Sequence, residues 1–126
     1  KIRMVFRDWP IFGPASEAAA RAAIASKYQG KYLAMHDALM AAPLPLNDAV
    51  IEATAKKAGV DWVRLQKDKA AHSKEIDELL ARNDRQAQMI GLQGTPGFII
   101  GKVLTFGGMT LDHLRANVAK ARRDGS

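Results

Sequence analysis

The chain has 126 residues, enough for one domain with a hydrophobic core, and 48% of its residues are apolar. Its formal net charge is +6, but the basic residues do not form the stripe with interleaved aromatic residues that is typical of a nucleic-acid interface. The chain contains no cysteine, which excludes disulfides and thiolate metal sites within it, and no apolar run long enough for a membrane-spanning helix.

The chain is expected to begin in a strand. Ile2, Met4 and Phe6 alternate with mostly basic residues over 2–7, which is the periodicity of a β-strand. Asp8-Trp9-Pro10 ends this strand, and Trp9-Pro10 either lines a groove or packs within the following loop. Because natural chains seldom begin within a strand, we expect that an N-terminal segment has been removed.

A block of helices is expected between residues 16 and 90. The helical periodicity of apolar residues and the polar residues at helix starts predict the following elements. The first is an alanine-rich helix over about 16–28 capped by Ser16, and the second carries the stripe Tyr32, Met35, Leu39 and Met40. The third is capped by Asn47 or Asp48 and ended by Gly59, and a short fourth is capped by Asp61. A long fifth helix begins at Ser73 and has Ile76, Leu79, Leu80, Asn83, Ala87 and Ile90 on one face.

A β-hairpin is expected after the helices. Residues 97–100 and 103–106 are apolar runs separated by Gly101-Lys102, a spacing typical of a tight turn between antiparallel strands. Pro96 directly precedes the first run. Because proline has no amide hydrogen to donate to a sheet, its presence at the start of a buried strand needs a special reason. Thr110 is expected to cap a last helix that turns Leu111, Leu114 and Val118 inward. The predicted fold is α/β with a helical insertion.

Two stretches resemble the DsbA-like branch of the thioredoxin superfamily. Residues 6–14 read FRDWPIFGP, similar to the family's FRDFPILGP, and residues 90–101 read IGLQGTPGFIIG, similar to its lGi-x-GTPaFiiG. The resemblance implies a thioredoxin-like fold with an inserted helical domain, in which 1–15 and 91–126 form a partial core and 16–90 the insertion. It also implies that the first strand and helix of the family's fold, which carry its Cys-x-x-Cys pair, are missing here.

The same resemblance implies the C-terminal part of a thiol–disulfide oxidoreductase that forms, reduces or isomerises disulfides in exported proteins. Gly94, Thr95 and Pro96 would then bind substrate, because the family's proline is cis and presents the preceding backbone to an extended peptide. No catalytic residue is expected in this chain, so the chain alone is expected to be redox-inactive. From the residues alone, a turn proline and a strand-capping threonine remain the alternative.

No metal site is expected, since His36, His72 and His113 fall on separate predicted helices. No cofactor is expected either, since the stripe of Tyr32, Met35, Leu39 and Met40 is interpreted as a helix-packing face rather than a cofactor or peptide face. The resemblance implies exported protein or peptide substrates, a redox partner for the parent protein, and a periplasmic, envelope or secreted location. No nucleic acid and no membrane insertion are expected. The missing strand would leave open strand edges, which would allow homo-oligomers.

Two other functions stay open at this point. One is a non-redox domain that uses the proline loop or an open strand edge to hold a peptide or a second copy of itself. The other is a relative of the glutathione-dependent isomerases and transferases, which share the helical insertion but not the cysteine pair.

Overall fold

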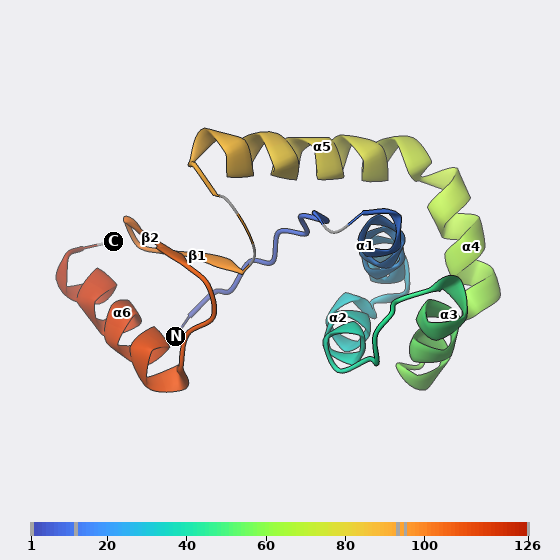
Figure 1. Ribbon diagram of the computed structural model, residues 1–126, viewed down its shortest axis with the longest axis horizontal. Coiled ribbons are helices and arrows are strands. Elements are labelled where there is room, and N and C mark those ends of the chain that lie inside the picture. Colours follow the sequence, from blue (N-terminus) through green and yellow to red (C-terminus); the bar gives the residue numbers. More distant parts are fainter. Residues whose placement is uncertain (1, 12, 93, 95, 126) are drawn as a thin grey trace. The chain divides into compact units, whose positions relative to one another are not determined.

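The structure is a computed structural model that describes residues 2–11, 13–92, 94 and 96–125, without the side chain of Phe106. The chain divides into two compact units, Lys1–Asp84 and Arg85–Ser126, and the division falls within a long helix (Figure 1). None of the helices in the described ranges combines the length and apolar character that a membrane crossing requires.

The first unit is helical. Its elements are α1 (Pro14–Ser26), the short 3-10 helix η1 (Lys27–Gln29), α2 (Tyr32–Met40), α3 (Asp48–Lys57), α4 (Trp62–Ala71) and most of α5 (Ser73–Met89). α1 packs against α2, α3 and α4, and its buried residues are largely alanines, which allow helices to approach closely. The side chains that fill the core between these helices include Ile24, Met35, Ile51, Val60, Leu65, Ile76 and Leu80.

Polar caps begin the helices where the sequence predicts them, with one exception. The Asn47 Oδ1 accepts the Val50 amide at 2.9 Å, and the Asp61 Oδ1 accepts the Arg64 amide at 3.1 Å. The exception is α1, where the predicted cap at Ser16 is wrong because the helix begins earlier, at Pro14. Proline suits a first helical position because its fixed φ is helical and the amide hydrogen that it lacks would have had no partner there.

The predicted inward stripe of α2 is partly wrong. Met35 is fully buried and Tyr32 and Leu39 pack beside it, but Met40 is exposed. At 3.6 residues per turn, a residue five positions after Met35 lies about 140° around the helix from it. Met40 therefore faces solvent, whereas Leu39, one position earlier, stays with the core.

The predicted strand over 2–7 is absent. Residues 2–11 are neither helix nor strand, and the side chains of Ile2, Met4 and Val5 are exposed. A strand needs a neighbour that accepts and donates its backbone hydrogen bonds. Within the described residues, the only strand pairing lies between residues 97 and 106, so 2–7 has no partner.

The second unit holds the predicted hairpin and the last helix. β1 (Gly97–Ile100) and β2 (Val103–Phe106) are antiparallel, and Ile100 pairs with Val103 across the turn at Gly101, whose φ is 62°. This positive φ is easily reached by glycine and strains other residues. The hairpin is confirmed with the predicted bounds.

The last helix, α6 (Leu111–Arg123), contacts β1 and is capped as predicted, since the Thr110 Oγ1 accepts the His113 amide at 3.1 Å. Leu114 and Val118 are half-buried, but Leu111 is exposed. Side chains on a helix lean toward its N-terminus, so that of the first residue projects beyond the packed turn. The expectation that Leu111 points inward is therefore wrong.

Candidate functional site

The predicted substrate-binding loop lies directly before β1. Pro96 is exposed, and its carbonyl oxygen accepts the amide of Gly107 at 2.8 Å, which joins the two ends of the hairpin. Gly94 is half-buried in a bend. Thr95 lies outside the described residues, and with it the cis or trans state of the bond before Pro96. The peptide-binding role of these three residues stays a prediction.

The chain contains no thiol, and the part that the structure describes shows no cluster of potential metal ligands. The chain has no cysteine, and the described residues include no cluster of three or more histidine or acidic side chains with metal-site geometry. His36 and His72 both stack on tyrosine rings, on Tyr32 and Tyr28 respectively. His72 also lies with its Nδ1 2.9 Å from the Glu75 Oε2, next to the start of α5.

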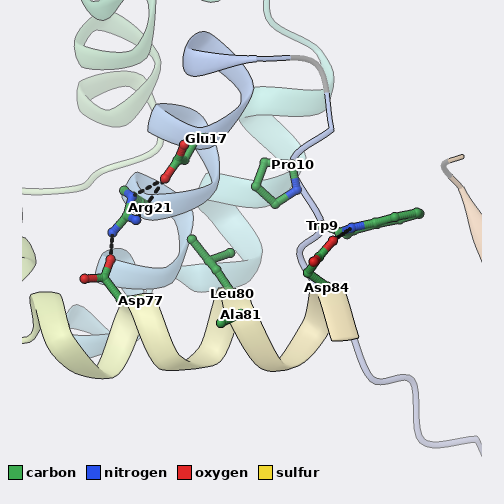
Figure 2. A pocket seen from close by; sticks show the side chains of 8 residues that line it. All are labelled: Trp9, Pro10, Glu17, Arg21, Asp77, Leu80, Ala81 and Asp84. Atoms are coloured by element: carbon green, nitrogen blue, oxygen red, sulfur yellow. Dashed lines mark hydrogen bonds and ion pairs between the residues drawn. The ribbon is translucent and has the colours of Figure 1, made fainter. Parts of the chain in front are cut away.

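Trp9-Pro10, a predicted candidate for a groove, does line a cavity of about 350 Å³ in the first unit (Figure 2). The Trp9 Nε1 donates a hydrogen bond of 2.8 Å to the Asp84 Oδ1 on α5, and Leu80 and Ala81 of the same helix form part of the wall. We call this the Trp9 cavity.

Charged side chains close the other end of the Trp9 cavity. Figure 2 shows Arg21 of α1 between Glu17 on its own helix and Asp77 on α5. Its guanidinium lies 2.9 Å from the Glu17 Oε1 and 2.5 Å from the Asp77 Oδ1. The hydrogen bond that Arg21 donates to the Glu17 carboxylate, together with its contact with Asp77, outweighs the effect of burial and raises the pKa of Arg21 above its ordinary value. These groups satisfy one another, so this end of the cavity ties α1 to α5.

A second polar group forms where Asp8 meets α2 and α5. The Tyr32 hydroxyl donates to the Asp8 Oδ2 at 2.8 Å, and the Asn83 Nδ2 donates to the Asp8 carbonyl oxygen at 2.9 Å. Burial raises the pKa of the Asp8 carboxyl above its ordinary value, against the smaller lowering effects of the Tyr32 hydrogen bond and of nearby His36. Burial also raises the pKa of Tyr32, and the Asp8 carboxylate adds to this effect.

Beside this group lies a cavity of about 210 Å³, which we call the Asp8 cavity. Its walls combine apolar, polar and basic side chains from residues 6–8, α1, η1, α2 and α5. The lining residues are Phe6, Arg7, Asp8, Ile24, Lys27, Tyr32, Leu79 and Asn83.

The sequence gives only part of this arrangement. Asn83 falls on the predicted apolar stripe of α5, and a polar residue on a buried face is a signal that it has a specific partner. Asp8 and Tyr32 carry no such signal, because one reads as a turn residue and the other as part of a packing stripe. Only the fold shows that they are hydrogen-bonded to each other.

Three comparisons with known proteins bear on what this chain is. A family model of the DSBA-like thioredoxin domain matches residues 1–119. The structure of a thioredoxin-like oxidoreductase from Silicibacter pomeroyi DSS-3 is similar at 38% identity and a TM-score of 0.88, over 94% of this chain and 68% of that one. Among curated proteins, none matches the chain.

Two further solved structures are similar. The thiol-disulfide exchange protein alpha-DsbA2 from Wolbachia pipientis has 30% identity and a TM-score of 0.88, over 92% of this chain and 63% of its own length. A periplasmic thioredoxin-like protein from Salmonella enterica serovar Typhimurium has 31% identity and a TM-score of 0.79, over 91% and 63%. This chain thus spans roughly two thirds of the proteins that it resembles.

These matches confirm the resemblance that residues 6–14 and 90–101 suggest, and with it the thioredoxin-like fold with a mostly helical content. The family model covers all the elements from α1 to β2 and most of α6. The chain belongs to the DSBA-like thioredoxin domain family.

Proposed function

We propose that this chain is the C-terminal part of a DsbA-like thiol–disulfide oxidoreductase acting on exported proteins, with Gly94, Thr95 and Pro96 as its contact with the substrate peptide. The match of the family model to residues 1–119 carries the proposal. The similar Wolbachia structure is that of a thiol-disulfide exchange protein, of which this chain spans 63%. The periplasmic Salmonella neighbour supports a location in the periplasm or cell envelope.

The reaction of the parent protein would be thiol–disulfide exchange. A cysteine thiolate attacks one sulfur of a substrate disulfide, a mixed disulfide forms, and the other sulfur leaves as a thiolate. A second cysteine thiolate then attacks the mixed disulfide, which releases the substrate reduced and leaves the enzyme oxidised; the reverse sequence forms a substrate disulfide. The chain has no cysteine, so alone it supplies substrate contacts and no redox centre.

A fusion tests this proposal. A strand–helix segment with the family's Cys-x-x-Cys pair is joined ahead of residue 1, and insulin reduction by dithiothreitol is followed by turbidity. We expect catalysis by the fusion, none by the chain alone, and none by a fusion with both cysteines changed to serine.

The substitution Pro96→Ala in the fusion tests the proposed contact with the substrate peptide separately from the redox reaction. We expect a rise in KM for a disulfide-bonded peptide, because the loop before β1 would no longer hold the substrate backbone. Turnover by the cysteine-free chain, or a folded fusion without exchange activity, would contradict the oxidoreductase proposal. An unchanged KM in Pro96→Ala would contradict the assigned contact.

One observation favours a second function, that of a non-redox domain that assembles with a peptide or a second copy. Ile2, Met4 and Val5 are exposed in a segment that is neither helix nor strand and that no strand of the described chain pairs with. An extended apolar segment with free backbone groups is a template for strand addition. The mass of the chain in solution distinguishes this function from that of a monomeric fragment.

A further inference from the structure

Asn83, which lines the Asp8 cavity, carries a buried acceptor that the fold leaves unused. The side chain of Asn83 is only 5% exposed, and its Oδ1 has no hydrogen-bond partner among the described residues. Its amide nitrogen is already committed to the Asp8 carbonyl oxygen. Native proteins rarely leave a buried polar atom unsatisfied, because its lost hydration is not recovered. The amide oxygen can only accept a hydrogen bond, so the missing partner must be an N–H or O–H donor.

The second acceptor of the cavity is the Asp8 carboxylate. It accepts the Tyr32 hydroxyl and is half-buried, and within the described part of the chain it forms no ion pair. A carboxylate that is partly removed from water is stabilised by a positive charge beside it. Asp8 and Asn83 together therefore favour a donor that is also a cation.

Two basic residues line the same cavity. Because their side chains donate hydrogen bonds, we expect the ligand also to carry an acceptor. Arg7 and Lys27 both line it, and Lys27 Nζ lies 5.3 Å from the centre of the Tyr28 ring rather than on Asp8. A simple cation would gain from Asp8 but would be repelled by these two side chains. A group with a positive end and an adjacent carbonyl oxygen suits both.

We propose that the Asp8 cavity binds an α-ammonium group with its adjacent carbonyl oxygen, the chemistry shared by a peptide amino terminus and a free α-amino acid. The ammonium donates to the Asp8 carboxylate and, once the Asn83 side chain turns its Oδ1 toward the cavity, to that oxygen as well. The carbonyl oxygen of the ligand accepts from Arg7 or Lys27. The apolar side chains of Phe6, Ile24 and Leu79 contact the side chain of the bound residue.

The size of the cavity limits the ligand to a single residue. Its volume of about 210 Å³ is below the ~300–1,000 Å³ of pockets that hold drug-sized molecules. The Trp9 cavity is larger, but its charged groups already satisfy one another. This binding site does not depend on the redox proposal, since every group that makes it belongs to the first unit.

Four probes test the proposal, each titrated into the ¹⁵N-labelled chain while backbone and Asn side-chain amide shifts are recorded. Leucinamide has the ammonium and the carbonyl, and leucine has a carboxylate in place of the amide. N-acetyl-leucinamide lacks the ammonium, and isoamylamine, which keeps the leucine side chain and the amino group, lacks the carbonyl. We expect saturable shifts at the Asn83 side-chain amide with the first two, and binding at least ~10-fold weaker with the last two, the worth of one charge-assisted hydrogen bond.

The comparison of the first two probes identifies the source of the ligand. Tighter binding of leucinamide indicates a peptide amino terminus, and tighter binding of leucine indicates a free amino acid. Equal affinity for N-acetyl-leucinamide, equal affinity for isoamylamine, or the absence of saturable shifts at Asn83 would overturn the proposal.

A pair of matched variants checks the position of the site. Asp8→Asn keeps the shape of the side chain and an acceptor for Tyr32 but removes the charge, so we expect leucinamide to bind at least ~10-fold more weakly. Asp84→Asn makes the same change at the Trp9 cavity and should leave the affinity unchanged. Urea unfolding of both variants establishes that they are folded. Unchanged affinity in folded Asp8→Asn would also overturn the proposal.

Discussion

Asp8 joins three parts of the first unit through two different groups. Its carboxylate accepts the Tyr32 hydroxyl of α2, and its backbone carbonyl accepts the amide of Asn83 on α5. The chain is thereby fixed to the helices at the point where the exposed segment 2–7 ends. The cost is a charge held away from water, which is why the pKa of Asp8 is raised.

A raised pKa means that the folded state prefers the protonated carboxyl. The stabilisation from Asp8 is then fully present below its unfolded pKa, near 3.8, and is lost as the pH rises through the higher folded value. We expect wild type to lose stability relative to Asp8→Asn over this window, with a slope of at most about 1.4 kcal/mol per pH unit for one proton. The other charged or titratable groups facing Asp8 are Arg7, Lys27, Tyr32 and His36.

Urea unfolding of both proteins from pH 3 to 7 measures this difference. Because Arg7, Lys27, Tyr32 and His36 are present in both proteins, their own titrations largely cancel in the comparison. Two parallel stability curves would show that burial does not shift the ionisation of Asp8.

At the scale of the element, α2 shows how one helix divides between core and surface. Met35 is 0% exposed and belongs to the core cluster, whereas Met40 at the end of the same helix is 75% exposed. The two side chains are chemically identical, so the difference comes only from their positions around the helix axis.

This pair allows a controlled test of the core. Met35→Ala removes a buried side chain and leaves a cavity, for which we expect a loss of about 2–5 kcal/mol in the free energy of unfolding. Met40→Ala makes the same change on the surface and should alter it by less than about 0.5 kcal/mol. Chemical denaturation of the two variants measures both. Equal losses would mean that the faces of α2 are assigned wrongly.

At the scale of the whole molecule, the chain spans about two thirds of the structures that it resembles and has a small sheet. β1 and β2 pair only with each other within the described residues, and the segment 2–7 has no strand partner. The predicted grouping of 1–15 with 91–126 as one core, with 16–90 as an insertion, stays a prediction. The boundary between the two compact units of the structure falls after residue 84.

The exposed segment gives a prediction for the molecule as a whole. We expect the isolated chain to self-associate with increasing concentration, because free backbone groups next to exposed apolar side chains favour strand addition between copies. Sedimentation velocity measures this association. Met4→Lys should weaken it, since a charge at a strand edge opposes pairing.

A matched control excludes a general effect of charge. Leu33 on α2 is 55% exposed, close to the 58% of Met4, so Leu33→Lys adds the same charge at a similar exposure away from the segment. It should leave the association unchanged. A chain that stays monomeric at all concentrations, or equal effects of the two variants, would rule out assembly through residues 2–7.

The sequence by itself determined the elements whose causes are local. Asn47, Asp61 and Thr110 cap their helices as predicted, and the hairpin turns at Gly101, because a cap or a tight turn is decided by residues within a few positions of each other. The two motifs at 6–14 and 90–101 were also sufficient to predict the family, which the family model confirms.

Only the tertiary structure decided what depends on distant partners. Residues 2–7 alternate as a strand does, but alternation cannot supply the neighbouring strand that would hold them in a sheet. The contacts of Asp8 with Tyr32 and Asn83 join positions 24 and 75 residues apart, beyond the range of any local pattern. The unsatisfied oxygen of Asn83, and the cavity that it lines, exist because the packing of α1, α2 and α5 removes that side chain from water.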